Sequence, residues 1–280
     1  MNMDLYCVMG NPVEHSKSPW IHARFAELTG QRLHYGKRLI PLANFAASLR
    51  EFMVDAAGTA RGCNITVPFK FEAAAVASRV SARAELARAA NILSFEADGI
   101  HADNTDGIGL VDDIQRNAGV ALAGRDVLLI GAGGAAAGVL GPLIEARPAR
   151  IAIANRTHAK AVALAERHQA LALLQKTELL TPDLQGLEGN FDVIINATAS
   201  SLSGAGVPVP ASVLRPGALA YDMMYGPAAR GFMAWALEHG AVPRDGLGML
   251  VEQAAEAFLI WRGVRPPSAQ VLAELRAVME

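Results

Sequence analysis

The sequence has few cysteines and no pattern of metal ligands. Cys7 and Cys63 are the only two cysteines among 280 residues, and their separation gives neither a C-x-x-C pair nor the spacing of a zinc module. The seven histidines form no metal-ligand pair at helical spacing. We therefore expect free thiols in a reducing compartment, no bound metal and no disulfide scaffold.

An excess of charge of one sign is lacking as well. The chain has 25 Lys and Arg against 27 Asp and Glu, so its net charge is -2. Without a basic excess, neither nucleic acid nor an anionic membrane is an expected partner. The content of 52% hydrophobic and 19% charged residues is typical of a soluble globular protein, and a small molecule is the expected ligand.

Segments that would direct the chain to a membrane are also missing. The first residues show neither the basic nor the apolar region of a secretory signal, so we expect a cytoplasmic protein. Residues 127–144 form a run of 18 without a charge, close to the minimum for a membrane span. Its several glycines and Pro142 favour instead a buried strand, a turn and a helix.

That uncharged run contains a dinucleotide-binding turn. Val127–Ile130 is predicted to be a buried strand, and Gly131, Gly133 and Ala136 follow it at the spacing G-x-G-x-x-A. A second strand at 150–154 and a helix at 157–169 complete a βαβα unit. The pyrophosphate of the ligand would lie at the helix N-terminus. The predicted cofactor-binding residues of this turn are Gly131, Ala132, Gly133, Gly134 and Ala135.

The end of the second strand indicates which dinucleotide binds. Rossmann domains that bind NAD commonly carry an acidic residue there, whereas this chain has Asn155, Arg156 and Thr157, followed by Lys160. Cations and a hydroxyl suit a 2′-phosphate, so NADP(H) is favoured over NAD. Asn155 or Thr157 would also serve as the cap of the following helix, and the two roles are compatible.

The N-terminal part of the chain alternates between strands and helices, which predicts a mostly parallel sheet covered by helices. Asp98-Gly99 separates two strands that we expect to form a hairpin. The predicted strands are 5–9, 33–39, 62–66, 91–95 and 100–102, and the predicted helices are 18–29, 43–55 and one after Pro68.

Two amphipathic helices, at 247–262 and 268–279, follow the last strand of the nucleotide-binding part and do not belong to its alternation. We expect them to pack on the N-terminal domain. The predicted fold class is α/β, with a discontinuous domain of residues 1–106 and 247–280 and a Rossmann domain of residues 107–246. Further elements expected in the latter are a helix at 108–117, strands at 191–196, 218–223 and 241–243, and a helix at 231–239.

Three polar segments follow predicted strands of the N-terminal domain, where open α/β sheets bind ligands. Ser18-Pro19 opens the predicted helix 18–29 with the proline at its first position, and Ser16 and Ser18 would hold a carboxylate or cap that helix. Lys70 ends the segment NITVPFK and would be a site residue or a solvated surface charge. The segment Asn104–Gly107 is equally compatible with a turn and a helix cap.

Together, the motifs resemble those of the shikimate dehydrogenase family. GNPVEHSKSP, NITVPFK, NTDGIG, GAGGAAAG, NRT, NATAS, YDMMYG and DGLGMLVEQAAEAF occur in the order of that family across almost the whole chain. The resemblance implies that the discontinuous domain binds the substrate and the Rossmann domain binds NADP. It implies reduction of 3-dehydroshikimate to shikimate in aromatic amino-acid biosynthesis, by a monomer or a homodimer.

The resemblance also implies roles for single residues. Lys70 and Asp106 match the catalytic pair of the family, and Ser16 and Ser18 match the hydroxyls that bind the substrate carboxylate. Lysine suits this chemistry, because a hydride that reaches a ketone carbon leaves alkoxide character on the oxygen, which needs a cation and a proton donor. The other matches are Thr66, Asn91, Tyr225 and Gln253 for the substrate, and Thr198, Met223 and Gly246 for the cofactor.

Two alternatives remain at this point. One is a quinate/shikimate dehydrogenase of catabolic type, often NAD-using, against which Arg156 argues. The other is a non-catalytic regulator that binds NADP or substrate on the same fold, since a fold does not fix a function. The presence of both Lys70 and Asp106 argues against a regulator.

Overall fold

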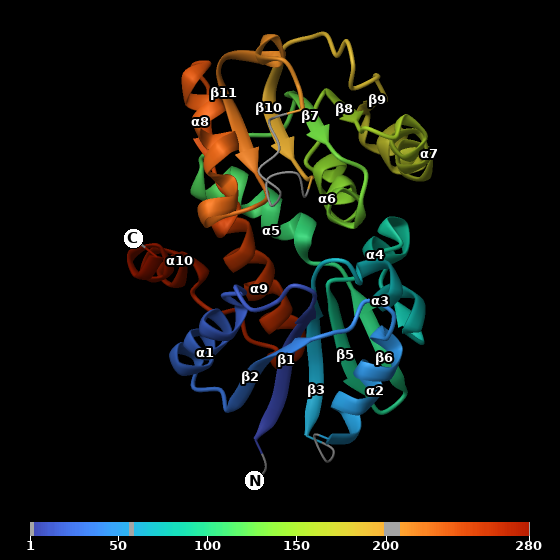
Figure 1. The fold of residues 1–280 in the computed structure, drawn as a ribbon, viewed down its shortest axis with the longest axis vertical. Coiled ribbons are helices and arrows are strands. Elements are labelled where there is room, and N and C mark those ends of the chain that lie inside the picture. The colour runs from blue at the N-terminus through green and yellow to red at the C-terminus, as the bar shows by residue number, and fades with distance from the viewer. Residues whose placement is uncertain (1–2, 56–58, 199–207, 280) are drawn as a thin grey trace. The chain divides into compact units, whose positions relative to one another are not determined.

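The computed structural model describes residues 3–55, 59–198 and 208–279, and the chain divides into two compact units. Unit 1 consists of Met1–Gly109 and Leu250–Glu280, and unit 2 consists of Leu110–Met249 (Figure 1). The two points at which the chain passes between the units lie three residues after the boundaries expected from the sequence. Each of these points lies inside a helix. These helices are α5 (Asp106–Asp112) and α9 (Leu247–Arg262).

Unit 1 is built on a mixed six-stranded sheet with the order β2-β1-β3-β5-β6-β4. The pairs β1–β2, β1–β3 and β4–β6 are parallel, whereas β3–β5 and β5–β6 are antiparallel. Its further elements are β1 (Asp4–Gly10), α1 (Ser18–Thr29), β2 (Leu33–Leu39), α2 (Phe45–Asp55), β3 (Ala60–Ile65), α3 (Lys70–Val76), β4 (Arg79–Val80), α4 (Ala82–Ala87), β5 (Ile92–Glu96), β6 (Gly99–Asp103) and α10 (Ser268–Met279).

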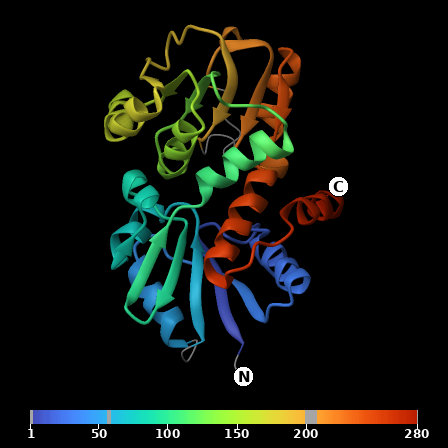
Figure 2. The ribbon, with the colours of Figure 1, turned by 180° about the vertical axis from the view of Figure 1, so that it is seen from behind.

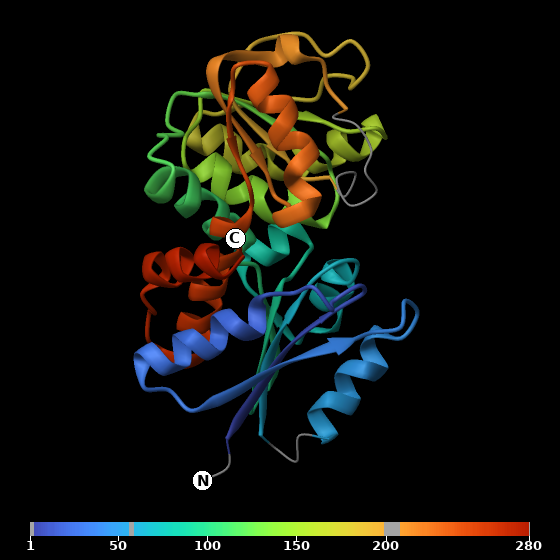
Figure 3. The same ribbon diagram turned by 60° about the vertical axis from the view of Figure 1, so that its left-hand side comes forward.

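The alternation of β1 explains why helices cover both faces of this sheet. Successive side chains of a strand point to opposite faces. Tyr6 and Val8 belong to a cluster that includes Trp261 of α9, whereas Cys7 and Met9 belong to a cluster with the aromatic residues of α2. Helices α1 and α10 lie beside one another, as Figure 3 shows. The C-terminal helices therefore complete unit 1, as the predicted fold class requires.

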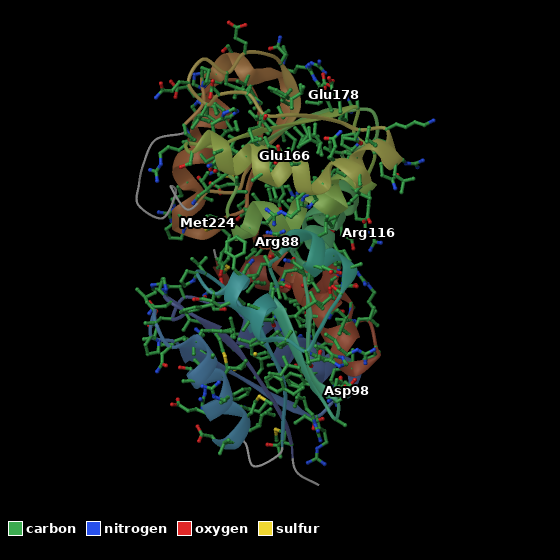
Figure 4. All side chains as sticks on the ribbon, turned by 90° about the vertical axis from the view of Figure 1, so that its right-hand side faces the viewer. Arg88, Asp98, Arg116, Glu166, Glu178 and Met224 are labelled. Atoms are coloured by element: carbon green, nitrogen blue, oxygen red, sulfur yellow. The ribbon has the colours of Figure 1, made fainter. Side chains whose placement is uncertain are left out.

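The hairpin of unit 1 forms as predicted. Asp98, labelled in Figure 4, lies between β5 and β6 and pairs with Arg79 at 2.7 Å. Gly99 follows with a φ of +131°, which favours glycine. The sequence did not reveal β4 and α4, because two strand residues and six helical residues are too few to show a hydrophobic period.

A buried histidine packs between the helices and the sheet of unit 1. His22 is fully buried, and its ring stacks on Tyr35 with the ring centroids 4.2 Å apart and the planes at 3°. Burial lowers the pKa of His22 from 6.5 to about 3, and the side chain of Asn64 opposes that shift. The folded protein therefore keeps this histidine neutral at pH values at which the unfolded chain protonates it.

We expect His22→Phe to reduce the loss of stability in mild acid. Below pH 6.5, His22 binds a proton in the unfolded wild-type chain, whereas in the folded protein it stays neutral down to about pH 3. The free energy of unfolding of the wild-type protein therefore falls as the pH falls. The slope is at most about 1.4 kcal/mol per pH unit for one group. Urea unfolding of both proteins between pH 7 and pH 4 measures it. Equal slopes would show that His22 does not contribute. His168, also buried, is common to both.

Unit 2 contains a parallel six-stranded sheet with the order β12-β11-β10-β7-β8-β9, as in a Rossmann-like domain. Helix α8 packs on the cluster that contains Leu128 and Ile130 of β7, and α6 lies beside α7 (Figure 2). The elements are the π-helical turn η1 (Asp113–Asn117), β7 (Asp126–Ile130), α6 (Gly134–Glu145), β8 (Arg150–Ala154), α7 (His158–Gln175), β9 (Glu178–Leu180), β10 (Phe191–Asn196), η3 (Ala211–Val213), β11 (Leu214–Asp222), η4 (Gly226–Ala229), α8 (Arg230–Glu238) and β12 (Val242–Arg244).

Three details of residues 106–180 correct or complete the sequence-based expectations. Helix α7 continues to Gln175 instead of ending at residue 169, because the alanine and leucine residues beyond 169 favour a helix. The predicted helix 108–117 begins at Asp106 and changes to a π-helical turn at Asp113. Strand β9 has only three residues, too few to be predicted.

Candidate active site

Lys70 and Asp106 meet in unit 1. Each is the first residue of a helix, Lys70 of α3 and Asp106 of α5. The Lys70 Nζ lies 2.5 Å from the Asp106 Oδ2, and the two side chains are only 14% and 7% exposed. The interpretation of Lys70 as a solvated surface charge is therefore wrong, because its ammonium group is enclosed and paired.

Asn91 organises the groups around this pair. Its Nδ2 lies 2.9 Å from the Asp106 Oδ1, 2.9 Å from the Thr105 Oγ1 and 3.1 Å from the Gln253 Oε1. Its Oδ1 accepts a hydrogen bond from the backbone N–H of Thr105 at 2.8 Å. One buried amide therefore joins the residue before β5 to the start of α5 and to α9. The structure thus brings Asn91, Gln253 and the Lys70–Asp106 pair into one polar cluster.

The backbone beside Asn91 holds Lys70 in place. The N–H of Ala90 donates to the Lys70 carbonyl at 2.8 Å, and the N–H of Ile65 donates to the Asn91 carbonyl at 2.7 Å. Thr66 lies next to them, and its N–H donates to the Met9 carbonyl at 2.9 Å. These bonds connect the end of β3 and the start of α3 with the neighbouring strands.

Thr66 also depends on a glycine at the end of β1. A Cβ on Gly10 would lie 2.2 Å from the Thr66 Cγ2, so a larger residue at position 10 would displace that threonine. The motif GNPVEHSKSP thus begins with a glycine because Thr66 approaches the backbone there.

Ser16 and Ser18 lie at the start of α1 and contact one another. The Ser16 Oγ donates to the Ser18 Oγ at 3.2 Å and accepts from the Ser18 N–H at 3.3 Å. Neither serine is the N-cap residue, because Lys17 occupies that position without a side-chain bond to the helix, although the Ser16 Oγ accepts from the first N–H of α1. Pro19 is accordingly the second helical residue, not the first. The two hydroxyls form a pair beside the N-terminus of α1.

Two polar residues near this cluster were missed in the sequence. The hydroxyl of Tyr35 donates to the Asn64 Oδ1 at 2.6 Å, and the Asn64 Nδ2 donates to the Asn91 carbonyl at 3.3 Å. Burial raises the pKa of Tyr35 well above its usual value, so the phenol stays protonated and remains a donor. Asn64 opens the segment NITVPFK and was therefore within reach of motif analysis, but Tyr35 lies in a strand without any signal of function.

The glycine-rich turn of unit 2 has the geometry that a phosphate site requires. Gly131 has a φ of +116°, and a Cβ there would lie 3.1 Å from the Ala197 carbonyl oxygen. Gly133 is the N-cap of α6, and a Cβ on it would meet nothing within 4 Å, which leaves space beside the helix N-terminus. Ala136 is fully buried, so the helix packs closely. Gly134 and Ala135 form the first turn of α6, and Ala132 lies between the two glycines.

The residues predicted to bind a 2′-phosphate surround the start of α7. Arg156, Thr157 and Lys160 are exposed, and the Asn155 Nδ2 donates to the Thr157 carbonyl at 2.8 Å. Thr157 is the N-cap residue, but its hydroxyl makes no cap bond to the helix. Side-chain capping is therefore not the role of Thr157. The cations of Arg156 and Lys160 and the hydroxyl of Thr157 are exposed to solvent after the end of β8.

The other predicted cofactor residues lie in loops at the ends of β10, β11 and β12. The Thr198 Oγ1 donates to the Asn196 Oδ1 at 2.8 Å. A Cβ on Gly246 would lie 2.3 Å from the Met223 carbonyl oxygen, so these two backbones touch. Tyr225, predicted as a substrate ligand, belongs to unit 2 and precedes η4. Ala199 and Ser200 of the NATAS segment lie outside the described residues.

Within the part of the chain that the structure describes, no group of three or more His, Cys, Asp or Glu side chains is arranged to hold a metal ion. No described helix is long and apolar enough to cross a membrane.

Comparison with known proteins identifies the family. Residues 8–93 match the shikimate dehydrogenase substrate binding domain, residues 113–203 match shikimate / quinate 5-dehydrogenase, and residues 246–276 match the shikimate 5'-dehydrogenase C-terminal domain. The chain is 70% identical to the shikimate dehydrogenase (NADP(+)) of Acidovorax sp. strain JS42 over 99% of its own length and 97% of that protein.

Comparison with solved structures supports the same family. An Ael1 enzyme from Pseudomonas putida is 46% identical, with a TM-score of 0.87 over 97% of this chain and 98% of that one. Shikimate 5-dehydrogenase from Thermus thermophilus, solved in complex with NADP(H) and shikimate, is 30% identical, with a TM-score of 0.83 over 98% and 99%. The mixed α/β substrate-domain fold and the Rossmann-like fold are thereby confirmed. The chain belongs to the NADP-dependent shikimate dehydrogenases, a family of oxidoreductases.

Proposed function

We propose that this chain reduces 3-dehydroshikimate to shikimate with NADPH, the direction required for aromatic amino-acid biosynthesis. Unit 1 binds the substrate and unit 2 binds the cofactor. The observation that carries the proposal is the enclosed contact between Lys70 and Asp106 among the amides and hydroxyls of unit 1. A cytoplasmic location, and assembly as a monomer or a homodimer, remain predictions.

Lys70 is proposed as the proton donor. Bound NADPH supplies a hydride to the ketone carbon, and negative charge develops on the ketone oxygen. The Lys70 ammonium stabilises that charge and delivers the proton. Asp106 orients the lysine through the 2.5 Å contact, and its second oxygen is held by Asn91 at 2.9 Å. Because both carboxylate oxygens are bound, the carboxylate cannot turn away from the lysine.

The remaining polar groups are proposed to recognise the substrate. The paired hydroxyls of Ser16 and Ser18, beside the N-terminus of α1, hold the carboxylate. Amides and hydroxyls can both donate and accept, which suits the hydroxyl groups of the ring. The groups proposed to bind those hydroxyls and to assist with the carboxylate are Thr66, Asn91, Tyr225 and Gln253.

The specificity for NADP(H) is proposed to reside at the start of α7. Arg156 and Lys160 supply cations and Thr157 supplies a hydroxyl, and no acidic side chain occupies residues 155–157. The pyrophosphate is proposed to bind at Gly131–Ala135, at the N-terminus of α6, where a Cβ on the N-cap residue Gly133 would meet nothing within 4 Å. Thr198, Met223 and Gly246 are proposed to contact the cofactor, the last two of them at its nicotinamide end.

A comparison of specificity constants tests the proposal. We expect kcat/KM for 3-dehydroshikimate to be much higher with NADPH than with NADH, and oxidation of shikimate to exceed that of quinate. A preference for NADH and quinate would establish the catabolic alternative. Binding of both ligands in a calorimeter without any turnover would establish a non-catalytic regulator.

Arg156→Gln tests the 2′-phosphate site separately. We expect KM for NADPH to rise roughly 10- to 100-fold, the loss of a charge-assisted hydrogen bond, whereas KM for NADH changes little. Arg147→Gln is the matched control, because Arg147 follows the C-terminal end of α6, opposite the glycine turn. Steady-state kinetics with both cofactors measure the effect. An equal rise for NADH would contradict a 2′-phosphate contact.

A further inference from the structure

A buried acid–amide pair lies at the carboxyl ends of the central strands of unit 2. Asn196 is the last residue of β10 and Asp222 is the last residue of β11, and they are paired in the sheet register. Asn196 also pairs with Ile130, the last residue of β7 before the glycine turn. The two side chains are 2% and 0% exposed. A fully buried carboxylate at the ligand-binding edge of a parallel sheet requires a reason.

Within this pair, donor and acceptor groups have a defined orientation. The Asn196 Nδ2 donates to the Asp222 Oδ2 at 3.3 Å, and the other oxygen of Asp222 accepts from the Met224 N–H at 2.9 Å. The Asn196 Oδ1 faces the other way and accepts from the Thr198 N–H at 3.2 Å and from its hydroxyl at 2.8 Å. The amide therefore donates toward the acid and accepts from the loop that follows β10.

These bonds hold two loops that border the cofactor turn. The Ala197 carbonyl and the Thr198 side chain lie against Gly131, at 3.1 and 3.3 Å from the position of a Cβ. In the second loop, the Gly246 N–H donates to the Met224 carbonyl at 2.8 Å, and Met224 follows the end of β11 (Figure 4). The acid–amide pair thus determines where both loops leave the sheet beside the turn.

We propose that Asp222 and Asn196 are positioning residues for NADPH. They hold Thr198 beside the glycine turn and Met223 where the nicotinamide end of the cofactor binds, without touching the cofactor themselves. The assignment of these two contacts rests on the proposed function. If this is so, cofactor binding depends on which side chain of the pair donates and which accepts. It does not depend on the volume of the two side chains.

Single isosteric changes break this orientation. Asp222→Asn keeps the acceptor for the Met224 N–H but turns an NH₂ group toward the NH₂ group of Asn196. Asn196→Asp keeps the acceptor for Thr198 but places two buried carboxylates against one another. The double exchange N196D/D222N restores these bonds, because the new amide at position 222 donates to the new carboxylate at position 196 and each oxygen that accepts from a loop is retained. The exchange also leaves the net charge unchanged.

Titration of NADPH fluorescence tests the proposal on the full chain. We expect the Kd for NADPH to rise roughly 10-fold in each single variant, the effect of a buried polar group without a partner, and to return to within about 3-fold of wild type in the double variant. KM for shikimate should change less than the Kd for NADPH in all three variants, because the proposed substrate groups other than Tyr225 lie in unit 1 and are untouched. Thermal unfolding is measured in parallel.

Wild-type affinity for NADPH in both single variants would overturn the proposal. A double variant that fails to fold, or that folds without regaining affinity, would overturn it as well, even if the single variants unfold. The proposed function fails in a different way. Should the wild-type chain not turn over 3-dehydroshikimate, the same loss and recovery of NADPH affinity would still establish the positioning role.

Discussion

Lys70→Met is expected to lower kcat for 3-dehydroshikimate by about 10²- to 10⁴-fold, the usual contribution of a general acid. Methionine approximates the length of lysine but supplies neither charge nor proton. The alkoxide that forms at the ketone oxygen would then lack its stabilising cation. KM for NADPH should change little, because the predicted cofactor residues lie in unit 2. Steady-state kinetics with both substrates varied separate the two effects.

Two further variants sharpen this test. Lys37→Met removes an exposed lysine of the same unit, whose Nζ donates to the Glu14 carbonyl at 2.5 Å, and should leave kcat unchanged. Lys70→Arg keeps the charge but moves it and barely releases a proton, so a large loss of kcat should remain. A near-normal kcat in Lys70→Met with only a raised KM would reduce Lys70 to a binding group.

Arg244→Leu is expected to lower the free energy of unfolding by about 3–5 kcal/mol, because it leaves a buried carboxylate without its cation. Asp113 is fully buried and receives two hydrogen bonds from Arg244, at 2.6 and 2.9 Å. The Tyr221 hydroxyl donates to it at 2.7 Å and the Asn117 Nδ2 at 2.9 Å. Gly248 packs so closely against this carboxylate that a Cβ at position 248 would clash with the Asp113 side chain.

Urea unfolding measures this loss, with Arg116→Leu as the control. Arg116 pairs with Asp112 at 3.2 Å but is 64% exposed, and such a pair contributes less than about 1 kcal/mol. Adding Asp113→Asn to Arg244→Leu should cost less than the sum of the two single changes, because both act on one interaction. An Arg244→Leu protein as stable as the control variant would contradict the account.

The parts of the fold with a repeating pattern could be predicted from the sequence. The β7 turn was predictable because a buried strand, a glycine with positive φ and a small-residue helix each leave a local signal. The π-helical turn at Asp113 was not predictable. Its carboxylate contacts Arg244 and Tyr221, which lie more than a hundred residues further along the chain. No local pattern in the sequence indicates contacts so distant along the chain, or the change from an α-helix to a π-helical turn at their carboxylate.

In the candidate site, too, some residues could be predicted from the sequence and others could not. Lys70 and Asp106 lie in motifs, whereas Asn91 was expected only through the resemblance, and the structure brings the three together. Tyr35 carries no motif, and it contacts the cluster only because β2 lies beside β1 and presents its hydroxyl to Asn64. Neither Ser16 nor Ser18 is the N-cap residue of α1, and the hydroxyl of Thr157 makes no cap bond to α7, because a hydroxyl near a helix start does not reveal which bond it makes.

Formation of NADPH by the wild-type chain from shikimate and NADP⁺, followed by absorbance, is the decisive measurement of whether this chain is a shikimate dehydrogenase. We expect turnover that requires both compounds, falls steeply when NAD⁺ replaces NADP⁺ and is nearly lost in Lys70→Met. A chain that binds shikimate and NADP⁺ but forms no NADPH would contradict this expectation.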